Sequence, residues 1–342
     1  MSKIHSIAAR LRQSLRHIVK GAAAAGLASL VAGIAATPAL AQVAAPDAPK
    51  ELRIGYQKYG TLVILKARGT LEKRLAEKGI GVKWTEFPFG PPLLEAINVG
   101  SIDVGTVGES PPIFAQAAGA DLVYIGNEPP APAAEALIVP KDSPVKSVAE
   151  LKGKRIAVAK GSNANFLLVK VLENAGLKYS DVEVTYLAPA DARAAFESGR
   201  IDAWSIWDPF LAAAEKQLNA RQLADGKGAV ANHQFYLSAR AYAEKYPEIV
   251  HILLEEIDRI DQWGKQNPRE VAKFISPLIG IELPVIELAA SRLSYGVRPV
   301  TPDVLAAQQK IADKFFELKL VPKQVRIADA AWNPVVKQAA AK

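Results

Sequence analysis

The sequence has no cysteine among its 342 residues and only one methionine. Without cysteine the chain can form no disulfide bond, no thiolate nucleophile and no cysteine-ligated metal site, and it offers no residue for lipid attachment. Histidine is also scarce, since only His233 and His251 lie beyond residue 41. Two distant histidines are poor material for a zinc site. We therefore expect no metal and no cofactor. Carboxylates alone could still catalyse a hydrolysis, but no acidic pair stands out in the sequence, so we expect no catalytic residues.

The chain also lacks the basic surface signature of a nucleic-acid-binding protein. Its formal net charge of +7 comes from 42 Lys and Arg against 35 Asp and Glu. Five of the seven excess charges belong to residues 1–41, which contain no Asp or Glu. The remainder has no basic run with interleaved aromatic residues, so a nucleic-acid partner is not expected.

Residues 1–41 have the three parts of a secretory signal peptide. A basic segment ending at Lys20 precedes an Ala- and Gly-rich apolar run over residues 21–36, and Ala39-Leu40-Ala41 then offers a small-residue cleavage site. A membrane anchor is the alternative, but this run is short and weakly apolar for a hydrocarbon core of ~30 Å. We expect export to the periplasm with cleavage after about Ala41.

The remaining chain repeats itself once, with a period of about 100 residues. Four pairs of segments correspond in order: 53–58 with 155–160, 82–88 with 182–187, 94–103 with 194–202, and 104–112 with 203–209. In each half, short apolar runs alternate with helical stretches. This alternation predicts an α/β protein of two similar lobes, each a largely parallel sheet with helices on both faces.

The two predicted lobes are not contiguous in the sequence. Apolar runs near Ala136 and near Val230 have the pattern of strands that cross between the lobes. We therefore assign residues 50–136 to the first lobe and residues 137–230 to the second. Residues 231–342 return to the first lobe and add C-terminal helices. A ligand cleft is expected between the lobes, with closure about the two crossover strands.

Nine segments between Leu52 and Tyr295 resemble the aliphatic sulfonate-binding proteins of ABC importers, part of a wider group that also takes up taurine and nitrate. The segments are residues 55–58, 86–91, 108–117, 127–130, 139–144, 160–162, 190–196, 203–209 and 232–237. Two positions depart from the family pattern. Glu109 stands where Asp is more common, and Asn163-Ala164-Asn165 stands where Ser-Ala-His is often found.

The resemblance implies a type II periplasmic-binding-protein fold and a monomer that is not an enzyme. It implies capture of aliphatic sulfonates for sulfur acquisition, with delivery to a membrane permease and its ATPase subunit. Alternatives are another small anion (taurine, nitrate, an aryl sulfonate or a sulfate ester), a chemoreceptor partner, or an enzyme on the same fold. The similar aryl sulfinate desulfinases use a cysteine nucleophile, which this chain lacks.

A sulfonate is a permanent anion with three acceptor oxygens, and helix starts at the carboxyl ends of strands offer it free N–H groups. Polar loops occur at such places in both halves. The candidate ligand-binding residues are Gln57, Gly108, Glu109, Ser110, Ser162, Asn163, Arg193, Trp207 and Asp208. Gln57, Ser110, Ser162 and Asn163 are expected donors. Gly108 would permit close backbone approach, and Trp207, or less favourably Phe89, would pack on the organic tail.

Several of these residues also fit structural roles. Ser110 and Asp208 precede proline and fit helix caps, while Trp207 fits a core position. Arg193 has two expected partners, the ligand and Asp191. Asp103 and Asp202 are expected to be turn or cap residues. His233 is expected to be a structural histidine, with a hydrogen bond across the hinge as the alternative.

Overall fold

The computed structural model describes residues 48–333 of the chain. The expected signal peptide and its cleavage site lie outside these residues. Within residues 48–333, no helix combines the length and the apolar character needed to cross a bilayer.

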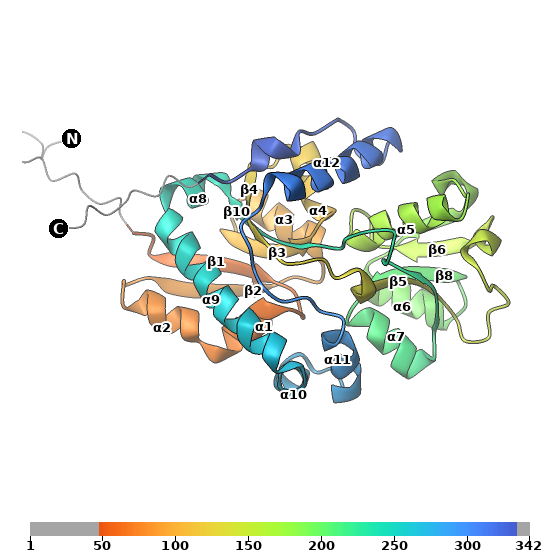
Figure 1. The fold of residues 1–342 in the computed structure, drawn as a ribbon, viewed down its shortest axis with the longest axis horizontal. Helices are drawn as coiled ribbons and strands as arrows, with labels where there is room; N and C mark the ends of the chain where they lie inside the picture. The colour runs from red at the N-terminus through yellow and green to blue at the C-terminus, as the bar shows by residue number, and fades with distance from the viewer. Residues whose placement is uncertain (1–47, 334–342) are drawn as a thin grey trace, which may run out of the picture. The chain divides into compact units, whose positions relative to one another are not determined.

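The first lobe is built on a five-stranded sheet in the order β2-β1-β3-β10-β4 (Figure 1). β1 pairs in parallel with β2 and β3, whereas β10 pairs antiparallel with β3 and β4. Four strands therefore run in one direction and β10 runs against them. The strands are β1 (Glu51–Tyr56), β2 (Gly81–Glu86), β3 (Val104–Gly108), β4 (Leu122–Asn127) and β10 (Gln234–Ala239).

The second lobe repeats this arrangement in the order β7-β6-β8-β5-β9. β6 pairs in parallel with β7 and β8, and β5 pairs antiparallel with β8 and β9. The strands are β5 (Glu135–Val139), β6 (Arg155–Val158), β7 (Glu183–Tyr186), β8 (Ala203–Trp207) and β9 (Arg221–Asp225). The predicted mainly parallel sheets are confirmed, and in each sheet the one opposed strand directly follows a connection between the lobes.

Helices cover both faces of each sheet. In the first lobe, one apolar cluster joins β1 to α1 and α9, and another joins β3 and β10 to α3, α4 and α12. In the second lobe, α5 packs on one face while α6 and α7 pack on the other. The helices of the two lobes are α1 (Thr61–Arg68), α2 (Thr70–Ala76), α3 (Gly90–Asn98), α4 (Pro111–Ala118), α5 (Asn163–Asn174), α6 (Pro189–Glu197) and α7 (Phe210–Leu218).

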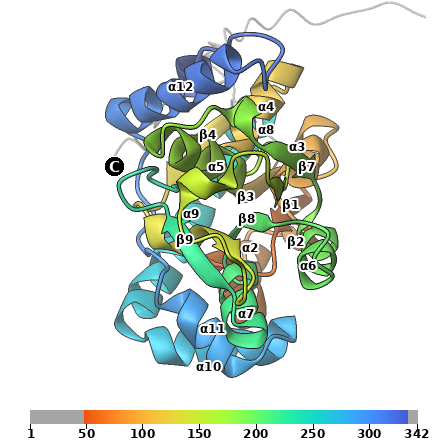
Figure 2. The same ribbon diagram turned by 90° about the vertical axis from the view of Figure 1, so that its right-hand side faces the viewer.

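The chain after β10 is helical and returns to the first lobe, as Figure 1 shows for α8 and α9. α11 packs on α10 and also contacts α7 of the second lobe; both views place α7 and α11 side by side (Figure 2). These helices are α8 (Arg240–Lys245), α9 (Pro247–Gln266), α10 (Pro268–Ile279), α11 (Leu283–Ala290) and α12 (Pro302–Glu317). Short 3₁₀ turns occur at Pro132–Ala134, Val148–Leu151, Tyr179–Asp181 and Ile327–Ala330.

Two connections join the lobes, over residues 128–134 and 226–233. They are hydrogen-bonded to each other: the Ala131 N–H donates to the Ala231 carbonyl at 3.0 Å, and the Glu128 N–H donates to the Gln234 carbonyl at 2.9 Å. Division of the chain into lobes at residues 136 and 230 stays a prediction. Closure about these paired connections also stays a prediction.

An Arg–Asp pair recurs at the same place in both lobes. The N–H and Nε of Arg53 donate to Oδ2 of Asp103 at 2.8 and 3.0 Å. The same groups of Arg155 donate to Oδ2 of Asp202 at 2.9 and 3.1 Å. The two aspartates are therefore structural, as expected from the sequence. The internal repeat is a repeat of side-chain contacts as well as of strand order.

Candidate functional site

A cavity of about 390 Å³ lies between the two lobes, at the carboxyl ends of their strands. Each lobe contributes three helix starts to its wall. The first turns that line it belong to α1, α3, α4, α5, α6 and α7, through Thr61, Gly90, Pro111, Asn163, Pro189 and Phe210. Since the N-terminal end of a helix carries partial positive charge, six such ends favour an anionic ligand.

The helix starts differ in the hydrogen-bond donors that they offer. α3 contains Pro91 and Pro92 in its first turn, and α4 begins with Pro111 and Pro112. Proline has no N–H, so these starts offer few donors. α1, α5 and α6 retain N–H groups at Thr61, Asn163 and Ala190. α7 also has an N–H group at Phe210, so the donors available to an anion come from α1 of one lobe and from α5, α6 and α7 of the other.

Five of the nine residues predicted from the sequence line this cavity: Gln57, Gly108, Asn163, Trp207 and Asp208. The other four, Glu109, Ser110, Ser162 and Arg193, lie outside its lining. A role in ligand binding stays a prediction for all nine. A ligand in the cavity can contact the first five directly. The other four can affect it only through neighbouring residues.

Asn163 brings the two lobes into contact at the cavity wall. Its Nδ2 donates to Asn232 Oδ1 at 2.5 Å, and its Oδ1 accepts from the Ser110 N–H at 3.4 Å. A Cβ placed on Gly108 would lie only 1.9 Å from Nδ2 of Asn163. Gly108 was expected to permit close approach, and the group that approaches it in this structure is Asn163. Gln57 lies nearby and donates through Nε2 to the Thr106 carbonyl at 3.2 Å.

Trp207 ends β8 and faces the cavity with an apolar neighbour. Its ring meets that of Phe210 edge to face, with centroids 6.0 Å apart. Leu293 and Phe87 from the first lobe line the same cavity. Trp207 is thus at the wall and also touches the second-lobe core. Phe89, the weaker candidate, lines a separate groove.

The two serines make local contacts. Ser162 is the N-cap of α5: its Oγ accepts from the Asn165 N–H at 3.3 Å and donates to the Ala159 carbonyl at 2.7 Å. Ser110 precedes α4 without capping it through its side chain. Its buried Oγ has no hydrogen-bond partner among the described residues. Ser110 thus occupies the N-cap position that the alternative interpretation gave it, without a side-chain capping hydrogen bond.

Glu109 is buried beside the second connection between the lobes. Its Oε2 accepts from the His233 N–H at 3.1 Å, and burial raises its pKa to about 7. His233 also places Nδ1 2.8 Å from the Glu128 carbonyl oxygen. Both residues therefore tie the connections together, and the His233 ring makes the contact between the two connections that was the alternative interpretation.

Arg193 does not pair with Asp191 in this structure, and its contact with the ligand stays a prediction. Its Nε donates to Glu197 Oε1 at 2.7 Å, one helical turn further along α6. The pair lies at the surface, away from the cavity lining. The expectation of pairing with Asp191 is wrong because an i, i+4 carboxylate lies on the same helix face, whereas an i−2 carboxylate does not.

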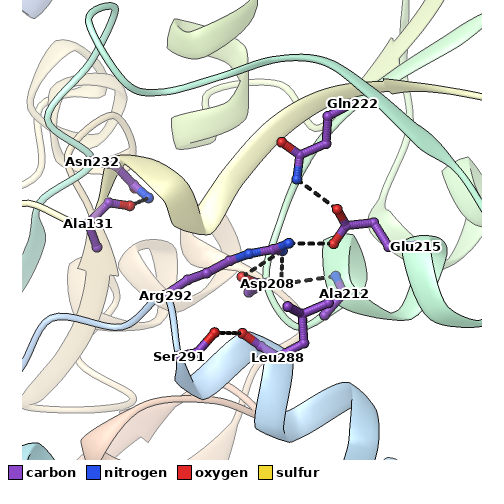
Figure 3. Close-up of polar contacts among 9 residues, drawn as sticks. All are labelled: Ala131, Asp208, Ala212, Glu215, Gln222, Asn232, Leu288, Ser291 and Arg292. Carbon is purple, nitrogen blue, oxygen red and sulfur yellow. Dashed lines mark hydrogen bonds and ion pairs between the residues drawn. The ribbon is translucent and has the colours of Figure 1, made fainter.

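Asp208 meets an arginine from the other lobe (Figure 3). Nη1 of Arg292 lies 3.4 Å from both carboxylate oxygens of Asp208, and Nη2 lies 2.6 Å from Oε2 of Glu215. Oδ1 of Asp208 also accepts from the Ala212 N–H in the first turn of α7 at 2.9 Å, although Pro209 and not Asp208 occupies the N-cap position of this helix. Burial raises the pKa of Asp208 to about 7, although Arg292 acts in the opposite direction.

The sequence interpretation missed a buried acidic group in the cavity wall. Glu128 accepts from the Tyr236 hydroxyl at 2.5 Å, and burial together with Asp261 holds its pKa above the usual range. The hydroxyl of Tyr59 lies buried nearby without a hydrogen-bond partner among residues 48–333. Glu128 and Tyr59 lie in or beside polar loops, so the sequence contained a feature that could have identified them. Asp261 lies within α9, where no such feature marked it.

Within residues 48–333, no group of three or more His, Cys, Asp or Glu residues is arranged to hold a metal ion. The donors around the cavity are amide, hydroxyl and backbone N–H groups, together with the Lys58 ammonium, which lies 3.6 Å from Oε1 of Glu86. This arrangement can bind a small anion with an apolar extension, oriented between the helix starts and the aromatic wall.

Comparison with known proteins gives consistent matches. Residues 75–271 match the family described as NMT1/THI5 like. The chain is 47% identical over 297 residues to an aliphatic sulfonates-binding protein of Escherichia coli (strain K12), covering 85% of this chain and 92% of that protein.

Two solved structures are similar over most of the chain. The alkanesulfonate-binding protein SsuA from Xanthomonas axonopodis pv. citri, bound to MOPS, has a TM-score of 0.79 and 43% identity, covering 83% of this chain and 98% of that one. The periplasmic aliphatic sulphonate binding protein SsuA from Escherichia coli has a TM-score of 0.76 and 46% identity, covering 84% and 93%.

Proposed function

The chain belongs to the NMT1/THI5-like family, and from this premise we propose that it is the solute-binding protein of an ABC importer for aliphatic sulfonates. It captures the sulfonate in the cavity between its lobes and delivers it to a membrane permease with its ATPase subunit. The relatives named above are binding proteins, and we assign this chain no catalytic role.

The convergence of six helix starts on one cavity is the observation that carries this proposal. A sulfonate remains ionised throughout the physiological pH range, so it needs hydrogen-bond donors and a positive potential, and it needs no proton. Helix starts supply both without a fixed cation. The free N–H groups of α1, α5 and α6 can reach the oxygens of one anion from both lobes, which links binding to closure.

The aromatic side of the cavity supports an organic tail on the anion. Trp207, Phe210, Phe87 and Leu293 line it, and a volume of about 390 Å³ exceeds the need of a bare inorganic anion. Each methylene buried against this wall is expected to tighten binding by about two- to fourfold. Nitrate and sulfate have no group to make this contact.

Periplasmic location and a monomeric state belong to the same proposal. The signal-like residues 1–41 support export. Protein recovered from the periplasm of an expression host is expected to begin at Gln42, which mass spectrometry of the intact chain measures. A retained N-terminal segment would contradict cleavage after Ala41.

A thermal-shift screen of this periplasmic form tests the ligand class. The panel contains methane-, butane- and hexanesulfonate, taurine, an aryl sulfonate, an aryl sulfate, nitrate and sulfate. A ligand at 100 times its dissociation constant adds about 2.7 kcal/mol to the free energy of unfolding. We expect stabilisation by alkanesulfonates, increasing with chain length. Stabilisation by nitrate and by none of the sulfonates would contradict the proposal.

A further inference from the structure

We propose that Arg292 determines acceptance of an anion by the closed cavity, because it neutralises the carboxylate of Asp208 from the opposite lobe. This inference rests on the proposed function and names a residue that governs its specificity. The cavity wall presents a paradox for an anion-binding protein, since Asp208 is an acidic residue that lines it.

Asp208 is fixed in the wall by its surroundings. It directly follows β8, its side chain is fully buried, and its Oδ1 is held by the N–H of Ala212 at the start of α7. The carboxylate therefore cannot turn outward into water. An ionised group in this position repels a sulfonate unless a cation stands beside it.

Arg292 supplies that cation from the first lobe. It follows α11, whose Val285 and Ala289 pack against Ala212 and Ala213 of α7. The Arg292 guanidinium is 14% exposed and lies between Asp208 and Glu215, at the distances given above (Figure 3). Among residues 48–333, it is the only basic side chain paired with either acid. Asp208 thus depends on a residue that reaches it only when the lobes meet.

The charges around Asp208 make this dependence strong. The groups that face it are Arg292, Glu215 on α7 and the Tyr59 hydroxyl, and Glu215 acts on Asp208 as a like charge. Without Arg292, Asp208 would remain in the cavity wall with Glu215, a like charge, as its charged neighbour. Protonation of Asp208 would then be the remaining way to remove its charge, so the defect should depend on pH.

The test is calorimetric titration of 1-hexanesulfonate into wild type, Arg292→Gln and Asp208→Asn/Arg292→Gln at about pH 5.5 and about pH 8.5. We expect Arg292→Gln to raise the dissociation constant about tenfold or more at the higher pH, because an unpaired acid then faces the anion. The loss should be smaller at the lower pH, where Asp208 is protonated. The double variant should recover most of the affinity at both pH values.

Arg326→Gln is the matched control, because Arg326 is 79% exposed and pairs with Asp329 outside the cavity lining. An equal loss at both pH values with no recovery in the double variant would overturn the proposal, since Arg292 would then bind the ligand itself or only brace the lobes.

A measurement without ligand separates this inference from the proposed function. Thermal unfolding of the same variants should show that Arg292→Gln lowers the melting temperature more at the higher pH, and that Asp208→Asn suppresses this effect. Additive effects of the two substitutions would overturn the pairing. Failure of wild type to bind any sulfonate would contradict the proposed function, whatever the unfolding measurements give.

Discussion

Glu109 and Glu135 are two carboxylates that the fold removes almost completely from water, with exposed fractions of 1% and 0%. Oε1 of Glu109 and both carboxylate oxygens of Glu135 have no hydrogen-bond partner among the described residues. Burial raises the pKa of both groups, and Glu109 further raises that of Glu135. Both flank the connections between the lobes, so the hinge contains acids that favour the protonated form.

The raised pKa of Glu109 makes stability depend on pH. The folded protein keeps a proton that the unfolded chain loses, between the usual pKa of 4.5 and the folded value of about 7. The free energy of unfolding therefore falls as pH rises through this window, and the whole of this loss of stability is present above it. This pH-dependent loss of stability amounts to up to about 3 kcal/mol, and Glu109→Gln should abolish it because glutamine does not ionise.

Urea denaturation of wild type and Glu109→Gln at about pH 5 and about pH 8 measures this difference. The exposed Glu95→Gln is the control. A Glu109→Gln variant that changes stability equally at both pH values would contradict the interpretation.

At the scale of elements, the repeated Arg–Asp pairs join corresponding strands of the two lobes, β1 with β3 and β6 with β8. Arg53 also donates to the Gly100 carbonyl at 2.6 Å, and Arg155 donates to the Gly199 carbonyl at 3.3 Å. Both glycines adopt a positive φ, +69° and +68°, which ends the helix before β3 in the first lobe and before β8 in the second. The arginine on β1 or β6 thus holds the turn that leads into β3 or β8.

The two pairs differ in exposure and should differ in strength. The side chain of Asp103 is 8% exposed and that of Asp202 is 31% exposed. Asp103→Asn should lower the free energy of unfolding by about 2 kcal/mol, because it breaks charge-assisted hydrogen bonds at a shielded site. Asp202→Asn should cost less than about 1 kcal/mol, since water screens that pair. Urea denaturation at neutral pH measures both, and equal costs would contradict the argument from burial.

For the whole molecule, contact between the lobes depends on a few small groups. Gly108 and Asn163 meet where the end of β3 faces the start of α5. The apolar contact between α7 and α11 forms at another place. Both contacts join the two lobes across the cavity, so a change at either should alter ligand affinity through closure.

Gly108→Ala places a methyl group within 1.9 Å of Nδ2 of Asn163 and should keep the lobes apart. We expect affinity for hexanesulfonate to fall about tenfold or more, while the stability of the free protein changes by less than about 1 kcal/mol. Small-angle X-ray scattering with ligand should show a larger radius of gyration than wild type.

Gly108→Ala/Asn163→Ala is the matched control, because it removes the side-chain atoms that the new methyl would meet. Recovery of compaction in this double variant is expected. Persistent expansion would show that the glycine serves another purpose.

The sequence by itself determined the class of fold, the internal repeat and the family resemblance. It also placed polar loops and helix starts at the carboxyl ends of the strands. These features are local or periodic, so they can be recognised without knowing what packs where. Gln57, Asn163, Trp207 and Asp208 were found in this way, and the structure places them at the cavity.

Only the tertiary structure decided which partners those residues meet. Arg292, Asn232 and Asp261 come from segments far along the chain from Asp208, Asn163 and Thr61, which they contact. Arg193 pairs with Glu197 on its own helix, and Ser162 caps the start of its own helix, so both side chains bond to partners close in the sequence. A loop sequence fixes which polar groups are present. The packing of distant elements fixes their direction, their burial and therefore their charge.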